Sequence, residues 1–148
     1  MARNRRILIR ELPKGKLTPE HFATDEAEVP DPGPGQVLVR TILLSQDAAN
    51  RAWMQGATYR DAISAGQVMD SGGLGEVIVS KADGLAVGDV VWGDTGWQEY
   101  AVLDGRRAQK VGPHRPLTHH VSLLGVAGKT AYHGLLNVPG IHAGETLL

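Results

Sequence analysis

The chain has 148 residues, of which 42% are hydrophobic, and its formal net charge is −1 at pH 7. This length suits one domain with a hydrophobic core, and the apolar content excludes a disordered tail. The nearly neutral charge argues against nucleic acid as a partner, because nucleic-acid binding needs a clustered positive field. The absence of cysteine excludes disulfides, thiolate metal sites and cysteine nucleophiles within these residues.

Hydropathy and glycine content indicate where the protein is located and which secondary structure it forms. No apolar run approaches the roughly 20 residues of a membrane span, and the first residues lack the apolar segment of a secretory signal peptide. We therefore predict a cytoplasmic protein with no membrane partner. The 19 glycines are almost twice the usual share of about 7% and are irregularly spaced, which indicates short strands joined by tight turns.

Turn residues divide the first part of the chain into short strand candidates. The strongest turn signal is the proline- and glycine-rich stretch 30–35, and it precedes a β-branched and aliphatic run typical of a strand buried on both faces. Short strands at roughly 10-residue spacing favour an antiparallel barrel or sandwich over βαβ units. Residues 45–67 lack strand periodicity, and we expect a loop with a helical turn or two. The predicted strands are 6–12, 22–29, 37–44, 74–80, 90–92, 97–103 and 107–111.

The pattern changes near residue 120. Ala127, Ala131 and Leu135 recur at helical spacing, which predicts an amphipathic helix that ends at the Pro-Gly pair 139–140. Gly134 lies in the middle of this helix, where close packing or ligand approach would explain it. Residues 143–148 resemble a turn followed by the opening of an apolar strand. We therefore predict one domain over 1–124, and a linking helix with the first strand of a second domain over 125–148, as the front part of a larger protein.

Several short segments match a known pattern in order along the chain. Together they resemble the zinc-independent medium-chain dehydrogenases/reductases, in the branch of leukotriene B4 dehydrogenase/prostaglandin reductases and plant double-bond reductases. The resemblance runs from Gln36 to Leu148. Its segments are SQDAANRAWM (45–54), VMDSGGLG (68–75), VGDVV (87–91), GWQEY (96–100), GKTAYHGLL (128–136) and AGET (143–146).

The resemblance implies a fold and a reaction. The expected fold is a mainly β, GroES-like, partly open barrel with a few helices, which leads into the first strand of an α/β Rossmann domain. Family members transfer hydride from a nicotinamide cofactor, commonly NADPH, to the β-carbon of an enone or enal, and they are commonly dimers. We expect NADPH, with NADH not excluded, a small-molecule enone, enal or quinone substrate, and a homodimer.

The resemblance also nominates site residues. Thr130, in the Thr-Ala-Tyr motif, is the candidate contact to the nicotinamide carboxamide, unless its hydroxyl bonds to its own helix backbone. Val126 is expected to approach the cofactor through backbone and van der Waals contact. Asn50 is a candidate for both catalysis and cofactor binding, as a hydrogen-bond partner of a carbonyl or ribose, unless it caps a turn.

The resemblance does not identify the proton donor directly. This chain carries Ala49 where prostaglandin-type and plant reductases have a tyrosine near the substrate. Tyr59, a few residues later, is the candidate catalytic replacement, although a ribose hydroxyl or a water would serve equally. Asp47 and Arg51 stand four residues apart and are expected to form an ion pair on a helix.

Metal chemistry is not expected, because the cysteine and His-Glu motif of the zinc branch are absent and the six histidines are scattered. Two alternatives to an enone reductase stay open. One is an NADPH-dependent quinone reductase, which shares the barrel and the Thr-Ala-Tyr helix. The other is a stand-alone GroES-like binding module without catalysis.

Overall fold

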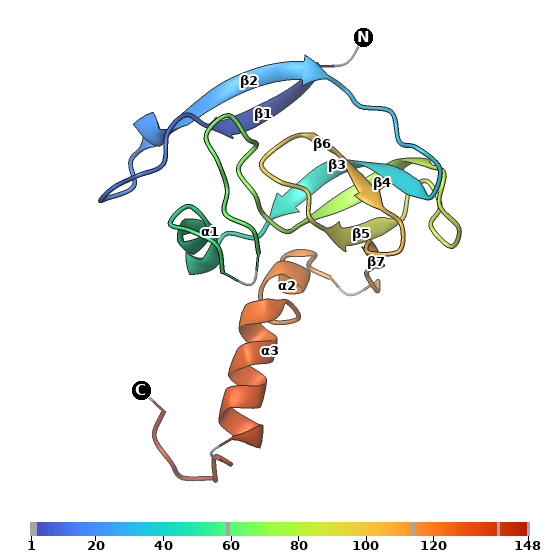
Figure 1. Ribbon diagram of the computed structural model, residues 1–148. Coiled ribbons are helices and arrows are strands. Elements are labelled where there is room, and N and C mark those ends of the chain that lie inside the picture. The colour runs from blue at the N-terminus through green and yellow to red at the C-terminus, as the bar shows by residue number, and fades with distance from the viewer. Residues whose placement is uncertain (1–2, 59, 114, 139, 148) are drawn as a thin grey trace. The chain divides into compact units, whose positions relative to one another are not determined.

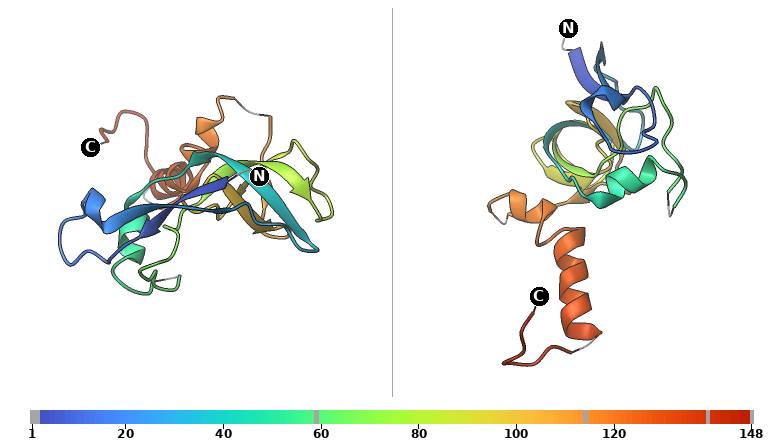
Figure 2. Two further views of the ribbon diagram at one scale, coloured as in Figure 1. Left: turned by 90° about the horizontal axis from the view of Figure 1, so that it is seen from above. Right: turned by 90° about the vertical axis from the view of Figure 1, so that its left-hand side faces the viewer.

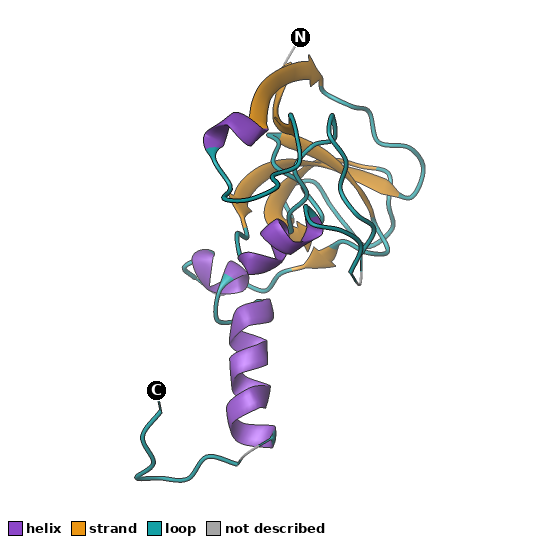
Figure 3. Ribbon diagram, turned by 60° about the vertical axis from the view of Figure 1, so that its left-hand side comes forward, coloured by secondary structure: helices purple, strands orange, loops and turns teal. Residues whose placement is uncertain are grey.

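The computed structural model describes residues 3–58, 60–113, 115–138 and 140–147, and the chain divides into two compact units, Met1–Gly112 and Pro113–Leu148. Strands dominate the first unit and helices the second (Figure 3). The sequence predicted a domain boundary after residue 124. That boundary refers to the domains of a complete protein, and it stays a prediction. Within the described residues, no helix is both long enough and apolar enough to cross a membrane.

The first unit begins with a two-stranded antiparallel hairpin, β1 (Arg3–Ile9) and β2 (Phe22–Glu28), with a short 3-10 helix, η1 (Pro19–His21), before β2. The acidic β2 pairs with β1 and belongs to no larger sheet. Buried Asn4 fastens the hairpin to the rest of the unit. Its Nδ2 donates to the Tyr100 carbonyl at 2.9 Å, and its Oδ1 accepts from the Tyr100 N–H at 3.0 Å.

Five further strands form an antiparallel sheet in the order β6-β3-β4-β5-β7 (Figure 1). They are β3 (Gln36–Leu44), β4 (Gly73–Ser80), β5 (Val90–Gly93), β6 (Tyr100–Asp104) and β7 (Gln109–Lys110). The sheet curves round on itself without closing (Figure 2). This confirms the predicted mainly β, partly open architecture. β3 pairs along both edges, with β4 and β6. The predicted burial on both faces holds only for Val37–Val39, while residues 40–44 are half-buried or exposed.

Two clusters of buried side chains hold the first unit together. The sheet core is built from β3, β4, β5 and β6, and the loop core joins the hairpin to helix α1 (Ala48–Trp53) and to the segment 54–70. The sheet core consists of Val37, Val39, Val77, Val91, Ala101 and Leu103. The loop core consists of Ile9, Trp53, Met54, Ile63 and Met69, with Leu17, Phe22, Ala49 and Trp97 packed against it.

The second unit contains α2 (Thr118–Val121), α3 (Val126–Tyr132) and a π-helical continuation, η2 (His133–Asn137). The predicted amphipathic helix is therefore present, although its last turn widens into a π-helix. Gly134 lies in that turn, and a Cβ built on it meets no atom within 4 Å. The expectation of close packing at Gly134 is thus wrong among the described residues.

The predicted opening of a strand after Ala143, as the first strand of a second domain, stays a prediction. Residues 141–147 contain a turn and irregular backbone, and no strand is assigned to them. A strand is stabilised by hydrogen bonds to a neighbouring strand, and no described residue of this unit belongs to a strand. The local sequence alone therefore does not produce one.

Candidate functional site

The helix α1 begins where the polar sequence after β3 caps it. The Asp47 carboxylate accepts a hydrogen bond from the Ala49 N–H, and the Asn50 Oδ1 accepts one from the Asp47 N–H, both at 2.8 Å. This reciprocal arrangement satisfies donors that a helix start otherwise leaves unpaired. The sequence predicted an ion pair between Asp47 and Arg51, but the two side chains do not pair. That prediction is therefore wrong, and the Arg51 Nη2 donates instead to the Gly15 carbonyl at 2.9 Å.

Asn50 also reaches across to the segment that enters β4. Only 7% of the residue is exposed, and its Nδ2 donates to the Asp70 carbonyl at 3.0 Å. Next along the chain, fully buried Ser71 donates from Oγ to the Ser45 carbonyl at 2.6 Å. The two side chains therefore hold the beginning of α1 against the entry to β4.

Arg60 connects the segment 54–70 with the turn after β5. Its guanidinium forms ion pairs with the carboxylates of Asp70 and Asp94, and its Cζ lies 4.8 Å from the centroid of the Trp53 ring. Burial alone would lower the pKa of Arg60, but hydrogen bonds and charge from Asp94 and Asp70 raise it above its usual value. The cation therefore stays charged between its two partners.

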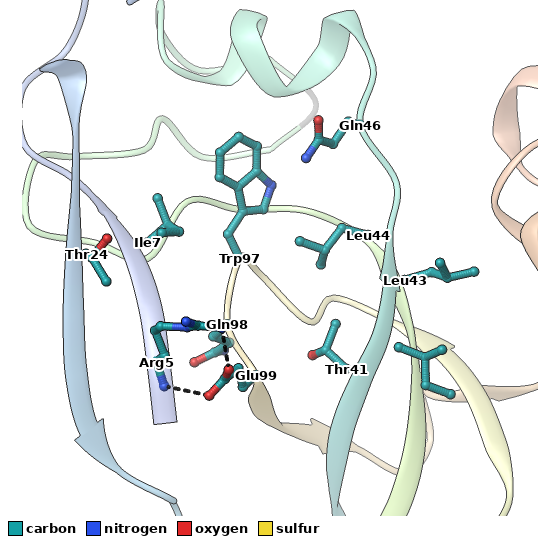
Figure 4. A pocket seen from close by; sticks show the side chains of 11 residues that line it. Arg5, Ile7, Thr24, Thr41, Leu43, Leu44, Gln46, Trp97, Gln98 and Glu99 are labelled. Atoms are coloured by element: carbon teal, nitrogen blue, oxygen red, sulfur yellow. Dashed lines mark hydrogen bonds and ion pairs between the residues drawn. The ribbon is translucent and has the colours of Figure 1, made fainter. Parts of the chain in front are cut away.

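A cavity of about 580 Å³ lies between the hairpin and the second half of β3 (Figure 4). We call it the tryptophan pocket. The Trp97 indole and the Gln46 side chain stand at one end, and the Arg5–Glu99 ion pair stands at the other (Figure 4). Its lining combines aliphatic and polar side chains and consists of Arg5, Ile7, Thr24, Thr41, Ile42, Leu43, Leu44, Gln46, Trp97, Gln98 and Glu99.

Two polar atoms in this lining are unusual. Trp97 Nε1 and the Thr41 hydroxyl are buried, and neither has a hydrogen-bond partner among the described residues. A buried donor without a partner costs about 1–3 kcal/mol, so these two groups lower the stability of the unit. An apolar cavity with a few donors is the usual form of a small-molecule site, and its volume lies within the usual range of about 300–1,000 Å³.

The predicted site residues belong to different units. Asn50 lies in the first unit, at the start of α1. Val126 and Thr130 lie four residues apart on α3 of the second unit, so they share a helix face, and both are exposed. The predicted proton donor Tyr59 lies outside the described residues. Ala49, which replaces the family tyrosine, packs against the loop core.

Sequence reasoning missed Trp97, Thr41 and Arg60 as site residues. Trp97 already lay in the GWQEY segment, and Gln46 in the segment 45–54, but nothing in the sequence brought the two together across one cavity. The resemblance could have indicated these residues, because it includes both the segment with Gln46 and the segment with Trp97. Arg60 lies outside the segments that carry the resemblance, and no sequence motif marked it as a site residue.

The described residues contain no group of three or more histidine and acidic side chains that could hold a metal ion. A cofactor of the nicotinamide type has different needs, namely a flat apolar surface and a hydrogen-bond partner for the carboxamide. On α3, the exposed Thr130 hydroxyl beside Val126, which is 70% exposed, fits those needs.

Comparisons with known proteins agree with the fold. A family model described as the N-terminal domain of oxidoreductase matches residues 5–111. The chain is 38% identical to the NADPH-dependent curcumin reductase of Escherichia coli over 99% of its own length and 43% of the relative's. It is 31% identical to the NADP(+)-dependent 2-alkenal reductase of Nicotiana tabacum, over 84% of this chain and 37% of that one.

A solved structure supports the same assignment. The structure of CurA from Vibrio vulnificus in complex with NADPH superposes with a TM-score of 0.82 at 32% identity, and it covers 90% of this chain and 40% of that one. The chain thus spans less than half the length of these relatives. The chain belongs to the zinc-independent medium-chain dehydrogenase/reductase superfamily, as the N-terminal domain of an oxidoreductase.

Proposed function

We propose that the complete protein containing this chain is an NADPH-dependent oxidoreductase that reduces the C=C bond of α,β-unsaturated ketones or aldehydes. The observation that carries the proposal is the tryptophan pocket. Two segments of the family pattern, at Gln46 and at Trp97–Glu99, meet around one amphipathic cavity. The names of the relatives, a curcumin reductase and an alkenal reductase, support this substrate class.

The pocket offers what such a substrate needs from this part of the protein. Hydride addition to the β-carbon places negative charge on the carbonyl oxygen, and donors aimed at that oxygen stabilise it. We assign Trp97 Nε1 and the Thr41 hydroxyl to this role, because both are buried without a partner. Around them Ile7 and Leu44 provide apolar walls for the carbon skeleton. These residues orient and stabilise, and they transfer no proton.

Cofactor contacts are proposed on α3. NADPH supplies the hydride when bound. The Thr130 hydroxyl is assigned to its carboxamide and Val126 to van der Waals contact with the ring, because both lie exposed on one helix face. Asn50 is proposed as a further polar contact in the cleft, through the amide hydrogen that it does not give to Asp70. Tyr59 stays the proposed proton donor.

The test uses the complete gene product. Its intact mass and a titration of NADPH fluorescence come first, followed by NADPH consumption with a neutral aromatic enone, a short enal and a quinone. We expect saturable NADPH binding and a product that has lost the C=C bond but keeps the carbonyl. Turnover of the quinone alone would identify a quinone reductase. No NADPH binding would leave a GroES-like binding module. A homodimer and a cytoplasmic location are proposed from the same resemblance.

A further inference from the structure

Arg60 lies beside two cavities other than the tryptophan pocket. Arg60 and Asp94 line two separate cavities. One of about 520 Å³ lies against residues of the segment 61–70, and one of about 430 Å³ lies against β5 and β6. The Arg60–Asp94 ion pair is therefore part of the wall of both cavities. Any movement of Arg60 changes the shape of both.

The second half of the segment that carries Arg60 is bonded to its neighbours through the backbone: the Ile9 N–H donates to the Gln67 carbonyl at 2.9 Å, and the Trp97 N–H donates to the Met69 carbonyl at 2.8 Å. Its backbone is also held by the Ile63 N–H, which donates to the Trp53 carbonyl at 3.2 Å, and by the Gly66 N–H, which donates to the Ile9 carbonyl at 2.7 Å. Ile63 is buried in the loop core. Arg60 adds the link across to β5, because its second partner, Asp94, follows that strand.

The contacts form a continuous series from α1 to the turn after β5. Asn50 donates to the Asp70 carbonyl, the Asp70 carboxylate pairs with Arg60, and Arg60 pairs with Asp94. Only 25% of the Arg60 side chain is exposed. A guanidinium presents several donors in a fixed plane and can bridge two carboxylates while stacking on an aromatic ring. A lysine provides only a point charge.

We infer that Arg60 is a positioning residue: it fixes the segment 54–70, and with it Asp70 and Asn50, against the turn that contains Asp94. The consequence for catalysis rests on the proposed function, because Arg60 then positions Asn50, a proposed site residue, through Asp70. The effect of Arg60 on the structural stability of the segment does not depend on the proposed function. The two consequences are measured separately.

The first measurement is hydrogen–deuterium exchange of the complete protein, read on peptides covering residues 61–68. Arg60→Gln should raise the exchange rate of this segment at least about tenfold, because local opening controls exchange. Arg60→Lys should restore part of the protection. The control is Arg3→Gln, since Arg3 forms an exposed ion pair with Glu26, and neither residue lines these two cavities. Unchanged exchange in Arg60→Gln would overturn the inference.

A double variant tests the partner. If Arg60 acts through Asp94, Asp94→Asn should raise exchange of the same peptides, and adding it to Arg60→Gln should have little further effect. Additive effects would show that the two side chains act independently and would contradict the bridge.

The second measurement is steady-state kinetics with NADPH and an enone. Arg60→Gln should lower kcat/KM for the enone about tenfold. If the wild-type protein is active and the variant matches it, the role of Arg60 at the site is wrong. If the wild type reduces no enone but exchange still rises in the variant, the positioning role stands and the proposed function fails.

Discussion

The amide of Asn50 joins two segments that are 20 residues apart, because its Nδ2 donates to the Asp70 carbonyl at 3.0 Å while its Oδ1 accepts from the Asp47 N–H at 2.8 Å. Both bonds are part-buried. Asn50 therefore contributes to the cap of α1 and to the entry of β4, whatever further contact it makes in the cleft.

Asn50→Ala should lower the free energy of unfolding by about 1–3 kcal/mol, because it removes a cap and leaves the Asp70 carbonyl without this donor. Urea unfolding of the 148-residue chain measures the loss. Asn50→Asp is the matched variant, since it keeps the acceptor for Asp47 but cannot donate to Asp70. Equal stability of wild type and Asn50→Ala would leave only a contact to a ligand as the role of this side chain.

Thr41→Val separates stability from function. The variant removes a buried hydroxyl that has no partner, so the free energy of unfolding should rise by about 1 kcal/mol. In the complete protein the same variant should lower kcat/KM for an enone about tenfold, because one donor to the carbonyl oxygen is lost. Thr24→Val, which changes an exposed threonine in the same lining, is the control. A more stable variant with undiminished kcat/KM would remove Thr41 from the site.

Thr130→Val tests the proposed cofactor contact. The variant keeps the shape of the side chain but loses its hydroxyl, so the Kd for NADPH should rise by about fivefold, which corresponds to one hydrogen bond of about 1 kcal/mol. A fluorescence titration of the complete protein measures it. Thr130→Ser keeps the hydroxyl and should bind NADPH as the wild type does. Identical affinities of all three proteins would discard the contact.

Gly73→Ala should destabilise the first unit by about 1–3 kcal/mol, which is typical of overpacking. A Cβ at this position would lie 2.5 Å from the Thr95 hydroxyl and 2.6 Å from the Leu43 carbonyl, and the backbone of β3 cannot move away cheaply. Gly112→Ala is the control, because nothing lies within 4 Å of its Cβ. Thermal unfolding of both variants makes the comparison. Equal midpoints would show that β3 and β4 can separate without cost.

Asp89 links stability to pH. The hydrogen bond from the Ala86 N–H, and then the one from Lys110, lower the pKa of this carboxyl below its usual value. A depressed pKa stabilises the folded state at pH values above the unfolded pKa of about 3.9, and this contribution is lost as the pH falls through the folded value.

Asp89→Asn should therefore be less stable than wild type at neutral pH, and the difference should shrink as the pH falls below about 4. Urea unfolding of the 148-residue chain at several pH values measures it. Asp83→Asn, at an exposed turn position, is the control. A difference that stays constant over the whole range would show that the charge of Asp89 contributes nothing to folding.

The sequence by itself determined the strands and the family. The aliphatic run that became β3 and the turn residues around it predicted a curved antiparallel sheet, because side-chain burial and glycine conformation are properties of short segments. Local spacing also predicted the helical turn that contains Asn50 and the amphipathic helix that contains Thr130. Helix spacing likewise anticipated α3, although not the π-helical turn that ends it.

Only the tertiary structure decided which residues face one another. Trp97 and Gln46 are 51 positions apart and share a pocket because the segment 97–99 runs beside the second half of β3, with the Thr41 N–H bonded to the Glu99 carbonyl at 2.8 Å. The role of Arg60 follows from its contacts with Asp70, Asp94 and Trp53, which only the fold brings together. Such contacts depend on chain packing over long separations, and no local pattern encodes them.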